Sequence, residues 1–201
     1  MEKVKKWSTQ SREAAPWYQH EEMGYNYRMS NIIAGIFRGQ LPYLETHIAQ
    51  KKAVYERYRD GLSDLPVCMN PFLPNSTPNY WLSCMLVEEE SMASQIRGEQ
   101  DYLYKSESGK SCAQEILDAM RTFNAEGRPI WKPMHMQPIY RMNPFVTVQG
   151  NGRGRTNAYI DGDSMDVGAD IFRRGLCLPS DNKMTEEQQR IVVEIIKKCF
   201  I

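Results

Sequence analysis

The sequence has no excess of charge of either sign, because 25 basic side chains balance 25 acidic ones among its 201 residues. Nonspecific binding of nucleic acid requires a strongly basic surface, so the composition argues against that class of function. No apolar run approaches the roughly 18 residues of a membrane span, and no apolar signal core follows the first lysines. We therefore expect no nucleic-acid partner, no membrane insertion and no export signal.

Cysteine and histidine are both scarce. The five cysteines are odd in number and include no Cys-x-x-Cys pair, which argues against a disulfide framework and a zinc site. The three histidines share no metal-ligand spacing, so we expect no metal site. Cys84, Cys177 and Cys199 lie in apolar runs and are interpreted as buried thiols. This usage fits a reducing cytoplasm.

The most informative segment is residues 24–31, Gly-Tyr-Asn-Tyr-Arg-Met-Ser-Asn, which leads into a run of apolar and small residues. Arg28 offers a planar fork of donors suited to phosphate or carboxylate, and Asn26 adds a neutral donor. In an extended segment, side chains two residues apart point the same way, so both groups can converge on one anion. Alternatively, Ser30 or Asn31 caps a helix and the tyrosines only pack, which the spacing alone slightly favours.

A second candidate is residues 128–135, Arg-Pro-Ile-Trp-Lys-Pro-Met-His, a strip stiffened by two prolines. It carries charge, stacking surface and a titratable ring, but it is equally consistent with domain packing that places Trp131 in a core. Residues 150–155, Gly-Asn-Gly-Arg-Gly-Arg, are a weak phosphate-loop candidate, because they neither follow a clear strand nor open a helix. We interpret residues 150–155 as a mobile surface loop.

Hydrophobic periodicity predicts two helices over residues 31–62. Pro42 should end or kink the first of them, and the stem of Lys51 should snorkel out of the apolar stripe of the second. Because the apolar stripes of these helices are long, we expect them to pack against a compact unit formed by the rest of the chain.

Beyond residue 62, strands mixed with amphipathic helices indicate an α+β domain over residues 63–201. The predicted elements are strands at 80–87 and 176–178, a polar surface excursion at 89–110, and helices opened by capping boxes at 111–114 and 185–188. The first of these helices should bury Phe123 and close at Gly127, and the second should bury Ile191 with its other apolar residues.

Five segments stand in a specific order along nearly the whole chain. Besides residues 24–31 and 128–135, they are residues 8–13 (Ser-Thr-Gln-Ser-Arg-Glu), 79–83 (Asn-Tyr-Trp-Leu-Ser) and 174–180 (Arg-Gly-Leu-Cys-Leu-Pro-Ser). This set resembles the DegT/StrS-type sugar-nucleotide aminotransferases, which are pyridoxal-phosphate (PLP) enzymes of the aspartate-aminotransferase fold. The Ser-Thr-Gln and Arg-Pro-x-Trp-Lys-x-Met-His signatures are most similar to enzymes that aminate UDP-4-keto-6-deoxy sugars, as in bacillosamine synthesis.

The resemblance implies long helices leading into the small C-terminal domain of that fold. Residues 1–30 would be a remnant of the cofactor domain with a loop that acts in trans, 31–62 interdomain helices, and 63–201 the small α+β domain. The implied activity is transfer of an amino group from glutamate to a UDP-linked 4-keto-6-deoxy sugar. The aminated sugar would serve cell-surface glycan biosynthesis, and the implied location of the enzyme is the cytoplasm.

The resemblance also implies roles for individual residues. Asn26 would bind the PLP phosphate of the partner across a dimer, with Arg28 close by on the phosphate or the substrate. The sugar-nucleotide pocket would include Arg128, Pro129, Ile130, Trp131 and His135. The implied partners are a second copy in a homodimer, or a missing N-terminal half, and the UDP-sugar.

One departure weighs against activity of the chain alone. The family's cofactor-binding lysine lies upstream of residues 24–31, but the only lysines there are Lys3, Lys5 and Lys6, without the Gly-rich sequence that surrounds the family's lysine. We therefore expect an inactive C-terminal portion of an aminotransferase that contributes no catalytic residue. The alternatives are a noncatalytic sugar-nucleotide-binding or assembly module and, less favoured, an unrelated nucleotide-binding α+β protein that uses residues 150–155.

Overall fold

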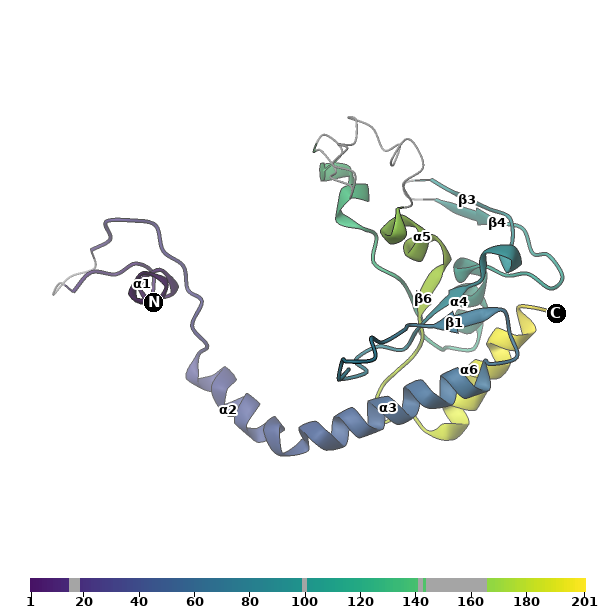
Figure 1. Ribbon diagram of the computed structural model, residues 1–201, viewed down its shortest axis with the longest axis horizontal. Helices are drawn as coiled ribbons and strands as arrows, with labels where there is room; N and C mark the ends of the chain where they lie inside the picture. Colours follow the sequence, from purple (N-terminus) through teal and green to yellow (C-terminus); the bar gives the residue numbers. More distant parts are fainter. Residues whose placement is uncertain (15–18, 99–100, 141–142, 144–165) are drawn as a thin grey trace. The chain divides into compact units, whose positions relative to one another are not determined.

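The computed structural model describes residues 1–14, 19–98, 101–140, 143 and 166–201. It comprises two compact units, Met1–Thr46 and His47–Ile201 (Figure 1). Among the helices of the described residues, none is long and apolar enough to pass through a bilayer. The finer division predicted at residues 30 and 62 stays a prediction.

The first unit contains two helices joined by an extended segment. Helix α1 spans Glu2–Ser8 and helix α2 spans Asn31–Gln40. Ser30 caps α2, since its hydroxyl accepts a 3.3 Å hydrogen bond from the backbone N–H of Ile33. The predicted cap is thus present. Helix α2 buries none of its residues, so its apolar stripe is not part of the core of the described residues.

Pro42 interrupts the helical run, as predicted. A short 3₁₀ turn, η1 (Leu41–Tyr43), separates α2 from α3 (Leu44–Gly61). Proline lacks a backbone N–H and is tolerated only in the first turn of a helix, which accounts for the break. In α3 the buried side chains are Val54, Tyr55 and Tyr58. The ammonium of Lys51 donates to the carbonyl of Ser180, so its stem crosses the apolar stripe as expected.

The second unit is built on a four-stranded antiparallel sheet in the order β1-β2-β6-β5. The strands are β1 (Val67–Met69), β2 (Cys84–Val87), β5 (Arg128–Pro129) and β6 (Gly175–Cys177). The predicted strand at 80–87 is shorter than expected. Tyr80 has φ 53°, a left-handed conformation that no strand accommodates, and the strand begins only at Cys84.

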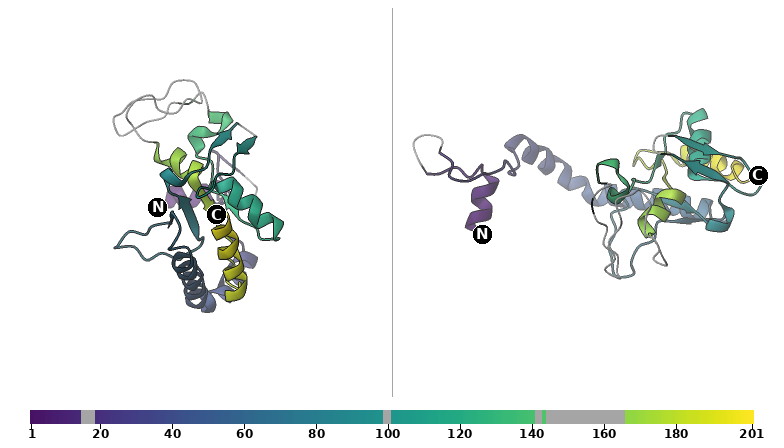
Figure 2. Two further views of the ribbon diagram at one scale, coloured as in Figure 1. Left: turned by 90° about the vertical axis from the view of Figure 1, so that its right-hand side faces the viewer. Right: turned by 90° about the horizontal axis from the view of Figure 1, so that it is seen from above.

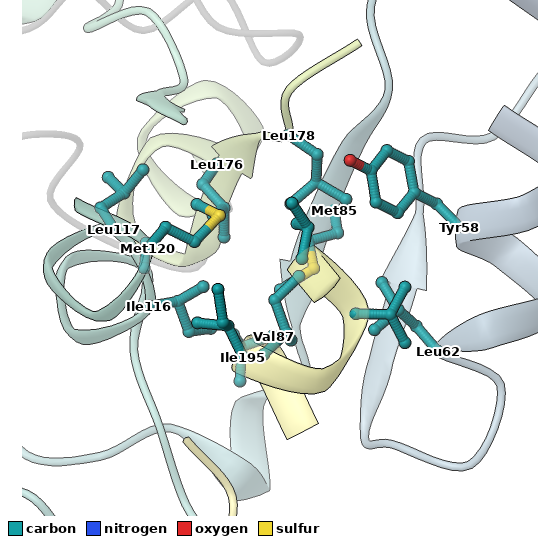
Figure 3. Close-up of a cluster of buried hydrophobic side chains, with 14 of the residues drawn as sticks. Tyr58, Leu62, Met85, Val87, Ile116, Leu117, Met120, Leu176, Leu178 and Ile195 are labelled. Atoms are coloured by element: carbon teal, nitrogen blue, oxygen red, sulfur yellow. The ribbon is translucent and has the colours of Figure 1, made fainter. Parts of the chain in front are cut away.

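One face of this sheet carries the core. Met85, Val87 and Leu176 point toward α3, α4 (Ala113–Thr122) and α6 (Glu186–Lys198). Figure 2 shows α4 and α6 side by side, in agreement with their contacts. Figure 3 shows how the aliphatic side chains of these elements interlock around Met85 and Ile195. The α+β class predicted for residues 63–201 is confirmed in the part that the structure describes.

The helix ends test the capping predictions. The box at Thr185 and Gln188 is present with both reciprocal hydrogen bonds, so that prediction is confirmed. The box predicted from Ser111 is wrong, because Cys112 is the N-cap residue and the Ser111 hydroxyl donates to Glu115 instead. The helix also ends at Thr122, which leaves Phe123 exposed and Gly127 outside the helix.

Two further predictions need correction. Ile191 is exposed, and Val193 takes its place in the core. Residues 89–110 are more than a surface excursion, since β3 (Gln95–Arg97) and β4 (Tyr102–Tyr104) form a two-stranded antiparallel sheet. Arg97 lies over the rings of Tyr102 and Phe172 and thereby fixes these strands to α5 (Val167–Arg174). Short 3₁₀ turns complete the unit: η2 (Glu89–Ser91), η3 (Met134–Met136) and η4 (Pro138–Tyr140).

Candidate functional site

In the first unit, the segment after α1 pairs with the Tyr-Asn-Tyr segment. Tyr25 N–H donates to the carbonyl of Trp7 at 2.7 Å, and Tyr27 N–H donates to that of Ser8 at 3.1 Å. Thr9 and Asn26 are bridge partners between these backbone bonds. Two motifs that are separate in the sequence therefore form one strand-like pair, and Asn26 lies beside the Ser-Thr-Gln motif.

A close backbone approach sets the geometry of this pair. Gln10 and Ser11 both have positive φ, 67° and 50°, and Gly24 lies directly against them. A Cβ on Gly24 would come within 2.5 Å of the Ser11 hydroxyl oxygen, and still closer to the backbone. Only glycine permits this contact, because the atoms it touches are backbone that cannot move aside.

Asn26 and Arg28 both line a cavity of about 690 Å³, here called the N-terminal cavity. Its lining is rich in hydrogen-bond donors and contains three basic groups and one acid. The full lining is Lys5, Ser8, Thr9, Gln10, Arg12, Glu13, Ala14, Asn26 and Arg28. Cationic side chains beside hydroxyl and amide donors are the chemistry that binds phosphate or carboxylate.

The second unit contains a more apolar cavity of about 710 Å³, the tryptophan cavity. Trp81 and Trp131 lie in its lining with ring centroids 6.1 Å apart and planes inclined by 33°. Both indoles are more than half exposed. The remaining lining residues are Lys51, Leu82, Glu126, Arg128, Pro129, Cys177, Leu178, Pro179, Ser180, Asp181 and Met184.

The charged groups of the tryptophan cavity are held in place by short contacts. Arg128 donates from Nε and from its terminal nitrogen to Glu126 Oε1, at 3.1 and 2.9 Å. Lys51 donates to the carbonyl of Ser180. Tyr58 donates to the neighbouring Pro179 carbonyl, and burial raises the pKa of its phenol, so it remains a neutral donor. The cavity thus offers flat aromatic surface with two cations in its lining.

The structure separates the predicted pocket residues into two groups. Arg128, Pro129 and Trp131 line the tryptophan cavity, whereas Ile130 and His135 are not part of its described lining. The ring Nε2 of His135 instead contacts Asp166 Oδ2 at 2.6 Å, and both side chains are largely buried. Residues 150–155 lie outside the described residues.

Sequence reasoning did not assign several lining residues to a site. Trp81 and Ser180 fall in segments that match the family's motifs, which is the signal that could have identified them. Lys51 was interpreted only as a snorkelling interruption of a helix stripe, whereas its ammonium donates to the carbonyl of Ser180 and lines the cavity.

Residues 1–197 match the sequence model of a known protein family, the DegT/DnrJ/EryC1/StrS aminotransferase family. The chain belongs to this family. The resemblance inferred from the ordered motifs is therefore confirmed, and the members of this family are sugar aminotransferases that depend on PLP.

Named relatives agree with this assignment. The chain is 31% identical over 201 residues to EpsN of Bacillus subtilis, named as a pyridoxal phosphate-dependent aminotransferase, and covers 43% of that protein. It is 24% identical over 187 residues to the GDP-perosamine synthase of Vibrio cholerae and covers 41% of it. The match spans 100% and 91% of this chain, respectively, so the chain spans less than half the length of these relatives.

Solved structures show the same fold at low identity. The aminotransferase TlmJ from Streptoalloteichus hindustanus superposes with a TM-score of 0.68 at 14% identity, over 98% of this chain and 44% of that one. DesV from S. venezuelae gives 0.67 at 17% identity, over 98% and 43%. The predicted α+β fold of the PLP-dependent aminotransferases is thus confirmed.

Proposed function

We propose that this chain is the C-terminal part of a PLP-dependent aminotransferase that transfers an amino group from glutamate to a UDP-linked 4-keto-6-deoxy sugar. The observation that carries the proposal is the family match over residues 1–197 together with two cavities whose lining suits the two ligands. A role in cell-surface glycan biosynthesis and a cytoplasmic location are parts of the same proposal.

The lining of the N-terminal cavity fits the phosphate of PLP. Asn26 and Arg28 contribute an amide and a guanidinium, and Ser8 and Thr9 add hydroxyl groups. Such charge-assisted hydrogen bonds anchor a phosphate tightly and fix its orientation. PLP, when bound, supplies the electron sink for the amino transfer, and these residues would hold its phosphate in place.

The tryptophan cavity suits the sugar nucleotide. Trp81 and Trp131 offer faces for a uracil ring, and Arg128 and Lys51 offer cations for a diphosphate. A largely apolar cavity with a few convergent polar groups is the usual form of a small-molecule site. Within this proposal, Pro129 stiffens the strip and Ile130 and His135 support it from outside the lining.

The proposal includes a partner. The family's lysine, which bonds to the cofactor, has no counterpart between Lys6 and Gly24 of this chain. An N-terminal half that carries the lysine would therefore complete the enzyme, and a homodimer would place residues 24–28 on the partner's PLP. The alternative is a noncatalytic sugar-nucleotide-binding or assembly module, which the same lack of a suitably placed lysine favours.

An absorbance titration with PLP, followed by borohydride reduction and peptide mapping, tests this proposal. The chain alone should give no stoichiometric adduct on a single lysine, because its exposed lysines lack a site that holds the ring. Mixing it with a separately produced N-terminal half that carries the family's lysine should restore binding. Asn26→Ala and Arg28→Ala should then weaken PLP binding, by about 1.5–3 kcal/mol for a lost hydrogen bond to a charged group.

The control for these variants is Arg38→Ala, which removes a cation of α2 that lies outside the N-terminal cavity. Mixed with the N-terminal half, this variant should bind PLP as tightly as the unsubstituted chain does. A single stoichiometric adduct on the isolated chain, with turnover of a UDP-keto sugar, would refute the proposal that the chain is an incomplete enzyme. UDP binding to the chain without any restored PLP binding would support the noncatalytic alternative.

A further inference from the structure

Two cysteines face each other across neighbouring strands of the central sheet. Cys84 of β2 and Cys177 of β6 are register partners, and their sulfur atoms are 3.5 Å apart. Alternation along β2 and β6 places both thiols on the sheet face opposite Met85 and Leu176, away from the core. The two thiols therefore form a contact pair outside the hydrophobic core.

The backbone hydrogen bonds identify which kind of antiparallel pair this is. On the β1 side, the Cys84 N–H donates to the side-chain Oδ1 of Asn70, and the Cys84 carbonyl accepts from the Asn70 N–H, each at 2.9 Å. On the other side, the strand pair β2–β6 is joined next to the cysteines, where the N–H of Leu178 donates to the carbonyl of Ser83 at 2.8 Å. Cys84 and Cys177 are thus a non-hydrogen-bonded pair, in which the Cα atoms are about 4.5 Å apart. That separation lies within the range that a disulfide spans, about 4.4–6.8 Å.

The pair lies beside the tryptophan cavity. Cys177 is buried, with 5% of its surface exposed, but it belongs to the lining of that cavity, and Cys84 is partly exposed. Arg128, the register partner of Cys177 on the other side, brings a cation near its sulfur. The hydrogen bond from the Cys84 thiol, helped by Arg128 and opposed by burial, lowers the pKa of Cys177. Cys177 is therefore the sulfur that more readily becomes a thiolate, the reactive form.

We propose that Cys84 and Cys177 form a reversible dithiol–disulfide site at the tryptophan cavity, oxidised by hydroperoxides. The proposal rests on the register, the sulfur contact and the cavity lining, and it does not depend on the aminotransferase function. It adds a reaction to the sequence interpretation of these cysteines as buried thiols.

The reaction balances with one hydroperoxide. The Cys177 thiolate attacks the peroxide, the O–O bond breaks, the leaving oxygen takes a proton to become an alcohol or water, and Cys177 becomes a sulfenic acid. The Cys84 sulfur then attacks the Cys177 sulfur, the S–O bond breaks and water leaves. In sum, two thiols and one hydroperoxide give one disulfide, one water and one alcohol or water. The disulfide would join β2 to β6 beside Leu178 and Pro179, the segment that borders the cavity.

Peroxide oxidation of the full native chain tests the proposal. The chain is treated with one equivalent of hydrogen peroxide, alkylated, digested with chymotrypsin and analysed by mass spectrometry. Chymotrypsin cleaves after aromatic residues between Cys68 and Cys84, which trypsin would leave on one peptide. We expect loss of two of the five thiols, a crosslink between the Cys84 and Cys177 peptides, and recovery of both thiols with dithiothreitol.

Matched variants separate the native pair from general reactivity. Cys68→Ser removes the most exposed thiol, and Cys199→Ser removes a partly buried one, so both should keep the crosslink. Cys177→Ser should abolish it while leaving the circular dichroism spectrum unchanged. Oxidation of the chain in guanidinium chloride should distribute crosslinks among all cysteines. A native chain that gives the same distribution, that favours Cys68, or that accumulates oxidised Cys177 without a crosslink would overturn the proposal.

Discussion

The phenol of Tyr58 donates a 2.8 Å hydrogen bond to the carbonyl of Pro179. Tyr58 lies in the last turn of α3 and is fully buried, whereas Pro179 belongs to the segment after β6 that lines the tryptophan cavity. This bond fixes the position of a cavity wall relative to α3, the longest helix among the described residues, and the core around Tyr58 keeps water from competing for it.

Tyr58→Phe should lower the free energy of unfolding by about 1–2 kcal/mol, because it removes one hydrogen bond and leaves the Pro179 carbonyl without that donor. Equilibrium unfolding in urea, followed by circular dichroism, measures the change. Tyr27→Phe is the matched control, since its ring is exposed, and it should shift the free energy by less than about 0.5 kcal/mol. Equal effects of both substitutions would show that the Tyr58 bond contributes nothing specific.

Gly24→Ala should separate the Ser-Thr-Gln and Tyr-Asn-Tyr segments, because the added methyl group has no room beside Ser11. The backbone N–H groups of Tyr25 and Tyr27 would then lose their partners on Trp7 and Ser8. We expect faster hydrogen exchange at these two amides, measured by NMR or mass spectrometry.

Gly35→Ala provides the control for that substitution. Gly35 lies inside α2, where an added Cβ meets nothing within 4 Å. Alanine should therefore stabilise α2 by roughly 0.5–1 kcal/mol and leave the exchange of Tyr25 and Tyr27 unchanged. Accelerated exchange in Gly35→Ala as well would mean that these amides report on the whole unit.

Titration with UDP should quench the tryptophan fluorescence of the chain, because Trp81 and Trp131 line the proposed nucleotide pocket. Trp131→Ala should weaken UDP binding by about 1 kcal/mol or more, the typical contribution of an aromatic face to a bound base. Trp7→Phe alters a tryptophan of the first unit, which contacts Lys3, and should preserve both the quenching and the affinity.

Asp170 should make the stability of the second unit depend on pH. A hydrogen bond from Arg174, with one from Arg173, lowers the pKa of its carboxyl below the ordinary value of 3.8. A lowered folded-state pKa stabilises the fold above the unfolded-state value, and this contribution is lost as the pH falls through the folded-state pKa. Asp170→Asn should thus cost about 1 kcal/mol at pH 7, and the cost should shrink as the pH falls below the ordinary carboxyl value of 3.8. Urea unfolding at a series of pH values, for the parent chain and the variant, measures this difference.

Local patterns in the sequence were sufficient for much of the fold. The break at Pro42, the cap at Ser30 and the box at Thr185 all depend on interactions within a few residues, so the local sequence determines them. The capping box predicted from Ser111 is absent because the Ser111 hydroxyl donates to the Glu115 carboxylate, one turn further along the chain. Burial of Phe123 was predicted wrongly because the helix ends one residue before it.

The site was harder to predict because its residues meet only through long-range packing. The family motifs pointed to residues 128–135 as part of a pocket. The contact of Trp131 with Trp81, however, depends on the segment before β2 lying next to the segment after β5. The left-handed backbone of Gln10 and Ser11 likewise could not be predicted, because it accompanies a contact with Gly24, which is distant in the sequence. His135 was predicted in the pocket, whereas its contact with Asp166 depends on a residue 31 positions away.

The lining of the tryptophan cavity comes from α3, the segment before β2, β5 with the residues on either side of it, and the end of β6 with the segment that leads to α6. No subset of these elements forms the cavity, so it exists only while the whole second unit is folded. Binding and folding are then thermodynamically linked, and a ligand at 100 times its dissociation constant would add about 2.7 kcal/mol to the free energy of unfolding. A rise in melting temperature therefore allows candidate sugar nucleotides to be ranked without any catalytic assay.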